Sequence, residues 1–331
     1  MSDAERLSRA RDAGAIPAGA RLIAFNPGPD LASALSELAA VAVEQARKPE
    51  HDALATAGLP VSPEIEASGD VALVCLDRAR ALSRALIARA ARAAPRVIVT
   101  GAKTDGIDAI AGELARLLPE GGRLAKAHGK IAWYDARPLP ATFAAWEAAA
   151  IPARGPHGFL TAPGMFSADG PDPGSVRLAA QFGPEIAGHV AELGAGWGWL
   201  AATLLAAAPG VETLDLHEAD HRALAAARAN VQDPRARFHW TDVARLPTPS
   251  APLDRVVMNP PFHAGRSGDP GLGRAFIAAA ARLLGPRGRL LMVANRHLPY
   301  EAALAEAFLE TRTREEAAGY KIIEARRPRR R

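Results

Sequence analysis

The chain has 331 residues, of which 49% are hydrophobic and 23% charged, so its length predicts two domains that can each bury a core. One cysteine, Cys75, excludes a disulfide framework and a Cys-rich metal site. We expect none of the nine histidines to bind a metal. There is no signal-peptide pattern, and the longest apolar run (199–208) is about half a membrane span. We therefore expect a cytoplasmic protein that inserts into no membrane.

The basic balance of the chain comes from its C-terminus. Residues 1–150 carry 18 basic and 18 acidic side chains, and residues 151–331 carry 22 and 18. Five of the basic residues lie in the final stretch, Arg326–Arg331, without which the second half has a net charge of −1. The pI of 9.6 therefore reports a short tail and is weak evidence for nucleic-acid binding.

The first half alternates short apolar runs with Ala-rich helical patterns. Such alternation predicts a mostly parallel sheet covered by helices. The predicted strands are 21–26, 71–76, 96–101 and 130–135, and the predicted helices are 30–47, 77–94 and 107–118.

A segment rich in proline and glycine, residues 138–174, interrupts this alternation and is predicted to be the interdomain linker. The pattern then resumes. It predicts strands at 189–193, 211–218, 236–242, 253–258 and 289–294, helices at 197–208, 220–231, 272–284 and 301–309, and a last hairpin ending at 320–325. The predicted domains are thus 1–137 and 175–325, followed by a tail at 326–331. Both halves are expected to be α/β units with mostly parallel, doubly wound sheets.

A glycine-rich turn follows the first strand of the second half. It runs from Glu192 through Gly194, Ala195, Gly196 and Gly198 into a helix. Glycines at alternate positions allow a ligand close to the backbone, and the helix start offers free N–H groups. A dinucleotide fingerprint would need glycine at 199, where the chain has tryptophan, so the spacing favours S-adenosylmethionine. A glycine-rich turn without a ligand is the alternative.

Acidic residues end the next two strands. A carboxylate at a strand end accepts hydrogen bonds from ribose hydroxyls, a role that we assign to Glu218 in preference to Asp215. Glu218 comes directly before a helical pattern, whereas Asp215 falls within the strand. Asp242 ends the third strand and is expected to accept from an adenine amino group, although a turn or cap role is the alternative.

The string Asn259-Pro260-Pro261-Phe262 is the most specific in the chain. Two prolines end the preceding strand and stiffen the backbone. The Asn259 side-chain oxygen and the Pro260 carbonyl then form a fixed pair of acceptors for an amino group, and Phe262 offers a stacking face for its ring. We interpret the string as a catalytic site for methyl transfer to nitrogen; a simple strand terminator is the alternative.

This string resembles the amino-group-directed class I methyltransferases. The wider pattern (Phe166-Ser167-Ala-Asp169-Gly170, Asn259 to His263, Val293 to Tyr300 and Tyr320-Lys321) is similar to the small-subunit ribosomal RNA methyltransferase C family, which modifies guanine N2 of 16S rRNA. The resemblance implies two tandem Rossmann-like class I methyltransferase domains, of which only the second binds S-adenosylmethionine. The first half lacks both motifs and fits the inactive role.

The resemblance also implies roles for further residues. Phe166, Ser167, Asp169 and Gly170 would close over the cofactor, and Asn295 and Tyr300 would flank the target pocket. On the residues alone, His263 either touches substrate or packs its loop. Lys103 and Lys130, at loops of the first half, are interpreted as phosphate contacts, with a solvated surface as the alternative.

Taken together, the sequence predicts an S-adenosylmethionine-dependent methyltransferase acting on a guanine N2 in 16S rRNA, with free rRNA or the 30S subunit as its partner. The alternatives are a 23S rRNA guanine or a glutamine amide of a translation factor as the target. A non-catalytic ribosome-assembly factor and a nicotinamide-dependent oxidoreductase are rivals of another class. Trp199 argues against the oxidoreductase.

Overall fold

The computed structural model describes residues 3–126, 128–261, 263–264, 267–268 and 270–329. The chain divides into two compact units, which we describe separately. The first comprises residues 1–152 and 162–164, and the second comprises residues 153–161 and 165–331.

The first unit is built on a seven-stranded sheet with the order β3-β2-β1-β4-β5-β7-β6. Its elements are α1 (Asp3–Asp12), β1 (Arg21–Phe25), η1 (Pro29–Leu31), α2 (Ala32–Ser36), β2 (Ala40–Glu44), α3 (Lys48–Thr56), β3 (Val61–Ser62), β4 (Val71–Cys75), α4 (Arg80–Ala93), β5 (Arg96–Ala102), η2 (Lys103–Asp105), α5 (Ile107–Leu117), β6 (Glu120–Lys126), β7 (Gly129–Asp135) and α6 (Thr142–Ala148).

The second unit also has a seven-stranded sheet, with the order β12-β11-β10-β13-β16-β18-β17. Its elements are β8 (Ala153–Arg154), β9 (Leu160–Thr161), α7 (Pro173–Ala179), β10 (Gly188–Leu193), α8 (Trp199–Ala207), β11 (Val211–Glu218), α9 (His221–Asn230), β12 (Ala236–Trp240), η3 (Val243–Arg245), β13 (Leu253–Met258), β14 (His263–Ala264), β15 (Ser267–Gly268), α10 (Pro270–Leu283), β16 (Leu284–Asn295), α11 (Glu301–Ala307), β17 (Phe308–Ala317) and β18 (Tyr320–Pro328).

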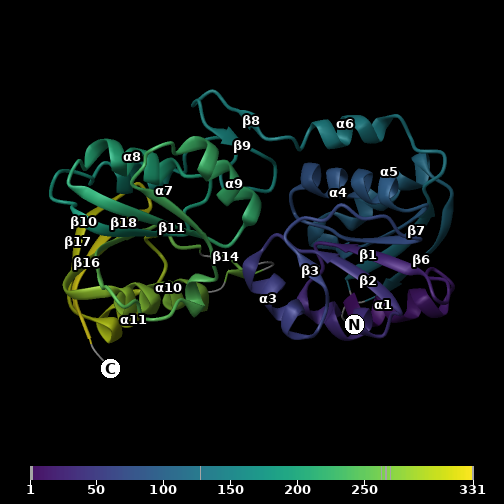
Figure 1. The fold of residues 1–331 in the computed structure, drawn as a ribbon, viewed down its shortest axis with the longest axis horizontal. Coiled ribbons are helices and arrows are strands. Elements are labelled where there is room, and N and C mark those ends of the chain that lie inside the picture. Colours follow the sequence, from purple (N-terminus) through teal and green to yellow (C-terminus); the bar gives the residue numbers. More distant parts are fainter. Residues whose placement is uncertain (1–2, 127, 262, 265–266, 269, 330–331) are drawn as a thin grey trace. The chain divides into compact units, whose positions relative to one another are not determined.

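The two sheets share one topology. In each, the first five strands of the order run parallel and the last two pair antiparallel. Helices cover both faces of each sheet (Figure 1); in the second unit, α7, α8 and α9 lie on one face and α10 and α11 on the other. The expected fold, two tandem α/β units with mostly parallel, doubly wound sheets, is confirmed.

The central strand β10 shows why this sequence folds into a covered sheet. Val190 packs toward α8, and Ala191 and Leu193 pack toward α10, each with essentially no exposure. A strand buried on both faces is apolar at successive positions rather than at alternate ones. Its neighbours β11 and β13 run parallel to it, so their carboxyl ends meet at one edge of the sheet. That edge is where ligands bind in open α/β sheets.

One predicted element is wrong. The sequence predicts a single helix over residues 30–47, whereas the structure has the short η1 and α2, then strand β2, and then the start of α3. The Ala-Val-Ala-Val-Glu sequence of β2 is compatible with helix by propensity, but it pairs in parallel with β1, and Val43 is fully buried. Strand β6, which contains Gly121 and Gly122, was not predicted; its antiparallel pairing with β7 defines it.

The segment between the two predicted domains contains regular structure. Helix α6 belongs to the first unit, where Phe143 and Trp146 stack on each other and join the core beside α4. The short hairpin of β8 and β9 belongs to the second unit. Residues 138–174 are thus divided between the two units.

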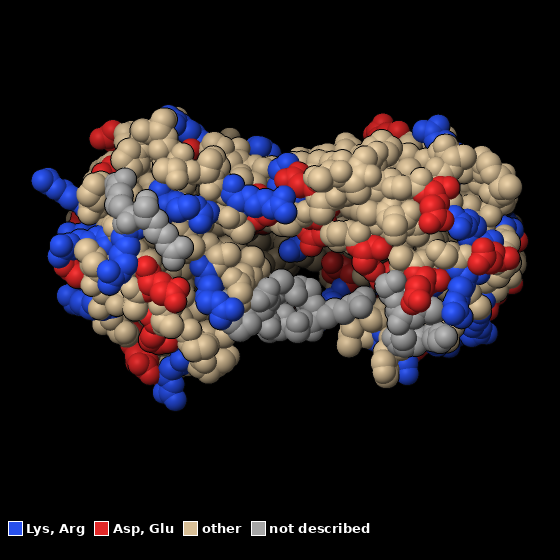
Figure 2. All heavy atoms as spheres, turned by 90° about the horizontal axis from the view of Figure 1, so that it is seen from below, with Lys and Arg blue, Asp and Glu red and all other residues tan. Residues whose placement is uncertain are grey.

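Charges of both signs are interspersed on the surface that Figure 2 shows. Ion pairs within each unit include Arg84 with Glu113 and Arg327 with Glu310. In the described part of the chain, no helix is long and apolar enough to cross a membrane.

Candidate active site

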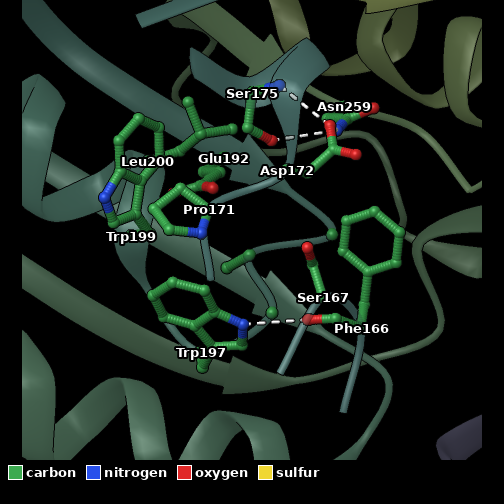
Figure 3. A pocket seen from close by; sticks show the side chains of 13 residues that line it. Phe166, Ser167, Pro171, Asp172, Ser175, Glu192, Trp197, Trp199, Leu200 and Asn259 are labelled. Carbon is green, nitrogen blue, oxygen red and sulfur yellow. Dashed lines mark hydrogen bonds between the residues drawn. The ribbon is translucent and has the colours of Figure 1, made fainter. Parts of the chain in front are cut away.

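A pocket lies at the carboxyl ends of β10 and β13 in the second unit (Figure 3). It is lined by the glycine-rich turn, by the start of α7 and by the segment before it. The lining residues are Phe166, Ser167, Pro171, Asp172, Ser175, Glu192, Gly194, Ala195, Gly196, Trp197, Trp199, Leu200 and Asn259. Seven of the predicted site residues therefore meet in one pocket: Phe166, Ser167, Glu192, Gly194, Ala195, Gly196 and Asn259.

The turn after β10 needs its glycines for two different reasons. Gly194, Gly196 and Gly198 all have positive φ, at 80°, 54° and 88°. A Cβ on Gly196 would meet no atom within 4 Å, because it would point into open space. A Cβ on Gly198 would lie 2.9 Å from a methyl carbon of Val231, which belongs to the segment after α9. Gly196 thus leaves room beside the pocket, and Gly198 allows close packing of α8 on α9.

Glu192 is a buried acid at the end of β10. Its side chain is 2% exposed, and its Oε2 has no hydrogen-bond partner among the described residues. Burial, with the nearby Glu218 carboxylate as the second cause, raises the pKa of Glu192 well above the usual value for glutamate. An unpaired buried carboxylate oxygen in a pocket is costly for the fold and is suited to receive a cationic group.

Glu218 holds the glycine-rich turn from the end of β11. Its Oε2 accepts a hydrogen bond from the backbone N–H of Gly196 at 2.7 Å, and its Oε1 accepts one from that of Asp220 at 2.8 Å. Desolvation raises the pKa of Glu218, and these two backbone donors partly oppose the increase. Asp215, the alternative acid, instead contacts Nε2 of His239 at 2.7 Å.

Asn259 follows β13 and enters the same pocket. Its Nδ2 donates to Oδ2 of Asp172 at 3.0 Å and to Oγ of Ser175 at 2.9 Å. A Cβ on Gly194 would lie 4.0 Å from the backbone carbonyl oxygen of Asn259, so the glycine-rich turn and the Asn-Pro-Pro string are neighbours. With both bonds made through nitrogen, the side-chain oxygen of Asn259 is left for another partner (Figure 3).

The segment before α7 is tied to the glycine-rich turn. Nε1 of Trp197 donates to the backbone oxygen of Phe166 at 2.9 Å, and its ring stacks on His157 at 5.3 Å between centroids. Asn230, at the end of α9, accepts from N of Leu160 at 2.7 Å and donates to the carbonyl oxygens of Leu160 and Trp197, both at 2.9 Å. These bonds hold Phe166, whose ring is 56% exposed, at the pocket.

The pocket lining does not include five of the predicted cofactor residues: Asp169, Gly170, Gly198, Glu218 and Asp242. Ser167 has a φ of 50°, and its hydroxyl donates to the carbonyl oxygen of Gly170 at 2.8 Å, which closes a tight turn around Asp169. Asp242 follows β12 and accepts from N of Ala244 at 3.0 Å as the cap of η3.

The pocket lining includes none of the predicted substrate residues whose side chains the structure describes. Asn295 ends β16, half-buried and outside the residues that line the pocket. Tyr300 is a correction: its ring is 1% exposed and packs against Gly273 of α10, so it belongs to the core rather than to a pocket wall. Lys103 and Lys130 lie in the first unit; Lys103 is exposed and Lys130 pairs with Asp108.

Of the remaining members of the Asn-Pro-Pro string, Pro260 is buried and Pro261 half-buried. Phe262 and the side chain of His263 lie outside the described residues. Across the described ranges, no three His, Cys, Asp or Glu side chains are grouped to hold a metal ion.

The sequence analysis missed Asp172, Ser175 and Trp197, which line this pocket, and Asn230, which holds the segment beside it. For Asp172 a signal existed, because Asp followed by Pro173 is a typical helix start, with proline in the first turn. We had assigned this position to a linker. No local pattern marks a partner for Trp197 or for Asn230.

The fold and pocket define a Rossmann-like α/β protein of the S-adenosylmethionine-dependent methyltransferase class. The family model described as "Methyltransferase small domain" matches residues 157–324, about half of the chain. The chain belongs to this family.

Similar proteins match about half of the chain. A ribosomal RNA small subunit methyltransferase C of Sodalis glossinidius is 36% identical over 167 residues, covering 50% of this chain and 47% of that protein. The one from Shewanella oneidensis is 34% identical over 163 residues, covering 48% and 46%. The aligned region thus spans about half the length of these relatives.

A solved structure is similar over nearly the whole chain. It is the T. thermophilus 16S rRNA N2 G1207 methyltransferase in complex with AdoMet and guanosine, at 27% identity and a TM-score of 0.78. The match covers 98% of this chain and 91% of that one. The likeness therefore extends over both units, including the first, which lies outside the matched family region.

Proposed function

We propose that this protein transfers a methyl group from S-adenosylmethionine to the exocyclic N2 amino group of a guanine in 16S rRNA. The observation that carries the proposal is the state of Asn259. Its side-chain nitrogen donates to Asp172 and Ser175, which leaves the side-chain oxygen for another partner, and Asn259 lines the same pocket as the glycine-rich turn. The similarity to a 16S rRNA N2 methyltransferase solved with AdoMet and guanosine supports the choice of substrate.

The pocket fits S-adenosylmethionine, which supplies a methyl group on a positively charged sulfonium. Glu192 has a buried, unpartnered carboxylate oxygen suited to the ammonium group of the cofactor. Gly196 leaves the backbone open beside the pocket, which Gly194 and Ala195 also line. Glu218 at the adjacent strand end is suited to the ribose hydroxyls. Asp242 is proposed for the adenine, with Phe166, Ser167, Asp169, Gly170 and Gly198 shaping the rest of the site.

The chain's part in the reaction is orientation. An aromatic amino group has two N–H donors in the plane of its ring, which match the side-chain oxygen of Asn259 and the carbonyl oxygen of Pro260. With both donors held, the nitrogen presents its face to the methyl donor, and no strong base is required of the protein. Alignment of this kind contributes about 7–11 kcal/mol in well-ordered systems.

The rest of the substrate site is proposed from the resemblance and from the side-chain chemistry. Phe262, after the rigid Pro261, would stack on the target base, with His263 and Asn295 beside it. Lys103 and Lys130 of the first unit would contact phosphate, for which Lys130 must leave Asp108. A target in ribosomal RNA also implies that the protein acts in the cytoplasm.

The test is a labelled-methyl assay on purified 30S subunits, free 16S rRNA, 50S subunits and a release factor. We expect label in the 16S rRNA, recovered as N2-methylguanosine by nucleoside mass spectrometry. Transfer to 23S rRNA or to a glutamine amide would move the substrate to one of the alternatives. Cofactor binding with no transfer to any of the four would leave a non-catalytic assembly factor and contradict the proposal.

A further inference from the structure

We infer that Asp172 and Ser175 are positioning residues that decide which end of the Asn259 amide faces the target, and thereby select an amino group. The inference rests on the proposed function and deepens it. Neither residue belongs to the glycine-rich turn or to the Asn-Pro-Pro string; both lie at the start of α7, more than eighty positions before Asn259 in the chain.

The first step is the identity of the atom that faces Asp172. A carboxylate has only acceptors, whereas an asparagine amide has an acceptor at one end and donors at the other. Oδ2 of Asp172 lies 3.0 Å from the terminal nitrogen of Asn259. If the amide were turned by 180°, two oxygens would face each other at about this separation, with no proton between them. Asp172 therefore excludes the turned amide.

Ser175 reinforces the same choice. Its hydroxyl oxygen accepts the second N–H of Asn259 at 2.9 Å, so both protons of the amide nitrogen have partners. Ser175 is only 7% exposed, so an amide proton that pointed at this buried position without an acceptor would destabilise the protein. Two acceptors on one nitrogen leave the opposite end of the amide, its oxygen, for a further partner.

The two acceptors are fixed by the fold rather than by the pocket. The Oδ2 atom of Asp172 that holds Asn259 also accepts from the backbone N–H of Ser175 at 2.9 Å, as the N-cap of α7. Pro173 stiffens the first turn, and a Cβ on Gly174 would lie 2.8 Å from Tyr320 of β18. The start of α7 therefore packs closely on the sheet. This packing holds the acceptor oxygens of Asp172 and Ser175 in place (Figure 3).

The consequence concerns which chemical group can react. A pocket that presents an oxygen here accepts an N–H donor, and it opposes a carbonyl oxygen at the same place. A turned amide would present N–H donors to the donors of an amino group, and the target would be misplaced. Because misplacement by about 1 Å can cost roughly 100-fold in rate, we expect orientation to control kcat.

The test uses substitutions that separate orientation from folding. Ser175→Ala removes one acceptor and leaves the cap. Asp172→Ser retains a capping oxygen, since serine is a good N-cap, but is too short to reach Asn259. Asp172→Asn keeps an oxygen that can accept from both donors. Asp254→Asn is the matched control: Asp254 lies near the opposite end of β13 and accepts one backbone N–H, from His189 at 2.9 Å.

We expect kcat to fall roughly 10- to 100-fold in Ser175→Ala and Asp172→Ser. Asp172→Asn should retain activity within a few-fold of wild type, and Asp254→Asn should be unchanged. Affinity for S-adenosylhomocysteine should stay within about twofold in all four. A loss of that affinity with an unchanged kcat would show that the pair serves cofactor binding, and would overturn the inference.

A double-mutant cycle and a spectroscopic readout complete the test. If Ser175 acts through Asn259, Ser175→Ala should add nothing in an Asn259→Ala background; an additive loss would contradict the inference. The chain has only four asparagines, so selective ¹⁵N-asparagine labelling resolves the Asn259 side-chain amide by its absence in Asn259→Ala. Its protons should exchange slowly with water in wild type and rapidly in Ser175→Ala and Asp172→Ser.

The two claims fail separately. Unchanged exchange in those variants would overturn the inference, whatever the activity of the protein. Absence of transfer by the wild-type protein, with protected Asn259 protons, would contradict the proposed function and leave the orientation of the amide established.

Discussion

Glu218 accepts a hydrogen bond from the backbone N–H of Gly196 at 2.7 Å and thereby joins the end of β11 to the glycine-rich turn after β10. The same carboxylate receives the N–H of Asp220 through its other oxygen. One side chain thus fixes two loops at adjacent strand ends, and it does so at the position proposed for the ribose of the cofactor.

This bond makes Glu218→Gln informative. A glutamine amide offers one acceptor where the carboxylate offers two, so one backbone N–H loses its partner, at a cost of about 1–3 kcal/mol. We expect the Kd for S-adenosylmethionine to rise at least tenfold in calorimetric titration. Glu212→Gln, on the same strand with its side chain 70% exposed, is the matched control and should bind normally. Equal affinity of both variants would show that Glu218 does not organise the turn.

The ionised Glu192 side chain should lower the stability of the cofactor-free protein and strengthen cofactor binding. Since its pKa is raised in the fold, the folded protein binds more protons than the unfolded chain; stability therefore increases as pH falls through the raised pKa, and the ionised form destabilises the fold above it. We expect Glu192→Gln without cofactor to have a higher Tm than wild type at pH 8, by a few degrees, and this gain should shrink toward pH 4.

The same substitution should weaken cofactor binding, because glutamine cannot balance the ammonium charge. Wild-type affinity should also decrease as pH falls through the raised pKa of Glu192, whereas that of Glu192→Gln should stay nearly flat. Differential scanning fluorimetry and titrations between pH 4 and pH 8 measure both effects. A variant that is less stable and binds as tightly as wild type would contradict the assignment.

Substitution by alanine should have different effects at two glycines of the turn. Gly196→Ala meets no atom within 4 Å, so it should lower stability only by the cost of a positive φ, about 1 kcal/mol, while its methyl group obstructs the cofactor. Gly198→Ala forces a Cβ within 2.9 Å of Val231 and should lower the Tm more than Gly196→Ala. Urea unfolding without cofactor distinguishes the two variants; a reversed order of stability would contradict the packing described.

Asn230 should control the segment that carries Phe166. Asn230→Ala removes three hydrogen bonds to Leu160 and Trp197, so we expect faster proteolysis within residues 155–170 and a faster cofactor off-rate. Gln232→Ala is the matched control, since the Gln232 amide donates to the carbonyl oxygen of Arg228 in the last turn of α9. Limited proteolysis followed by mass spectrometry locates the cleavage. Unchanged cleavage would show that the segment is held by Trp197 alone.

The sequence predicted the fold well where patterns are local. The strands around β10, β11 and β13 are apolar runs that end in glycine, acid or proline, and each was placed to within about two residues. The prediction failed at β2, whose Ala-Val-Ala-Val run is compatible with helix until its parallel pairing with β1 is known. Tertiary pairing decides such a segment, and no window of sequence contains it.

In the candidate site, too, residues marked by a local pattern could be predicted, and residues defined by distant partners could not. The residues after β10 and β13 could be found because glycines and prolines alter the backbone directly. Asp172 and Trp197 could not be assigned their roles, since these depend on partners 87 and 31 positions away, Asn259 and Phe166. Tyr300 was placed at the target pocket by resemblance, but the space beside Gly273 allows its ring to pack in the core.

The central claim is that an oriented acceptor pair, which includes the oxygen of Asn259, holds an exocyclic amino group for methyl transfer. The most direct measurement compares 16S rRNA that carries guanosine at the mapped target with RNA that carries inosine there, which lacks only the N2 amino group. We predict stoichiometric methylation of the guanosine RNA, none of the inosine RNA, and a loss of at least 100-fold with Asn259→Ala. Methylation of the inosine RNA, or full activity of Asn259→Ala, would contradict the account.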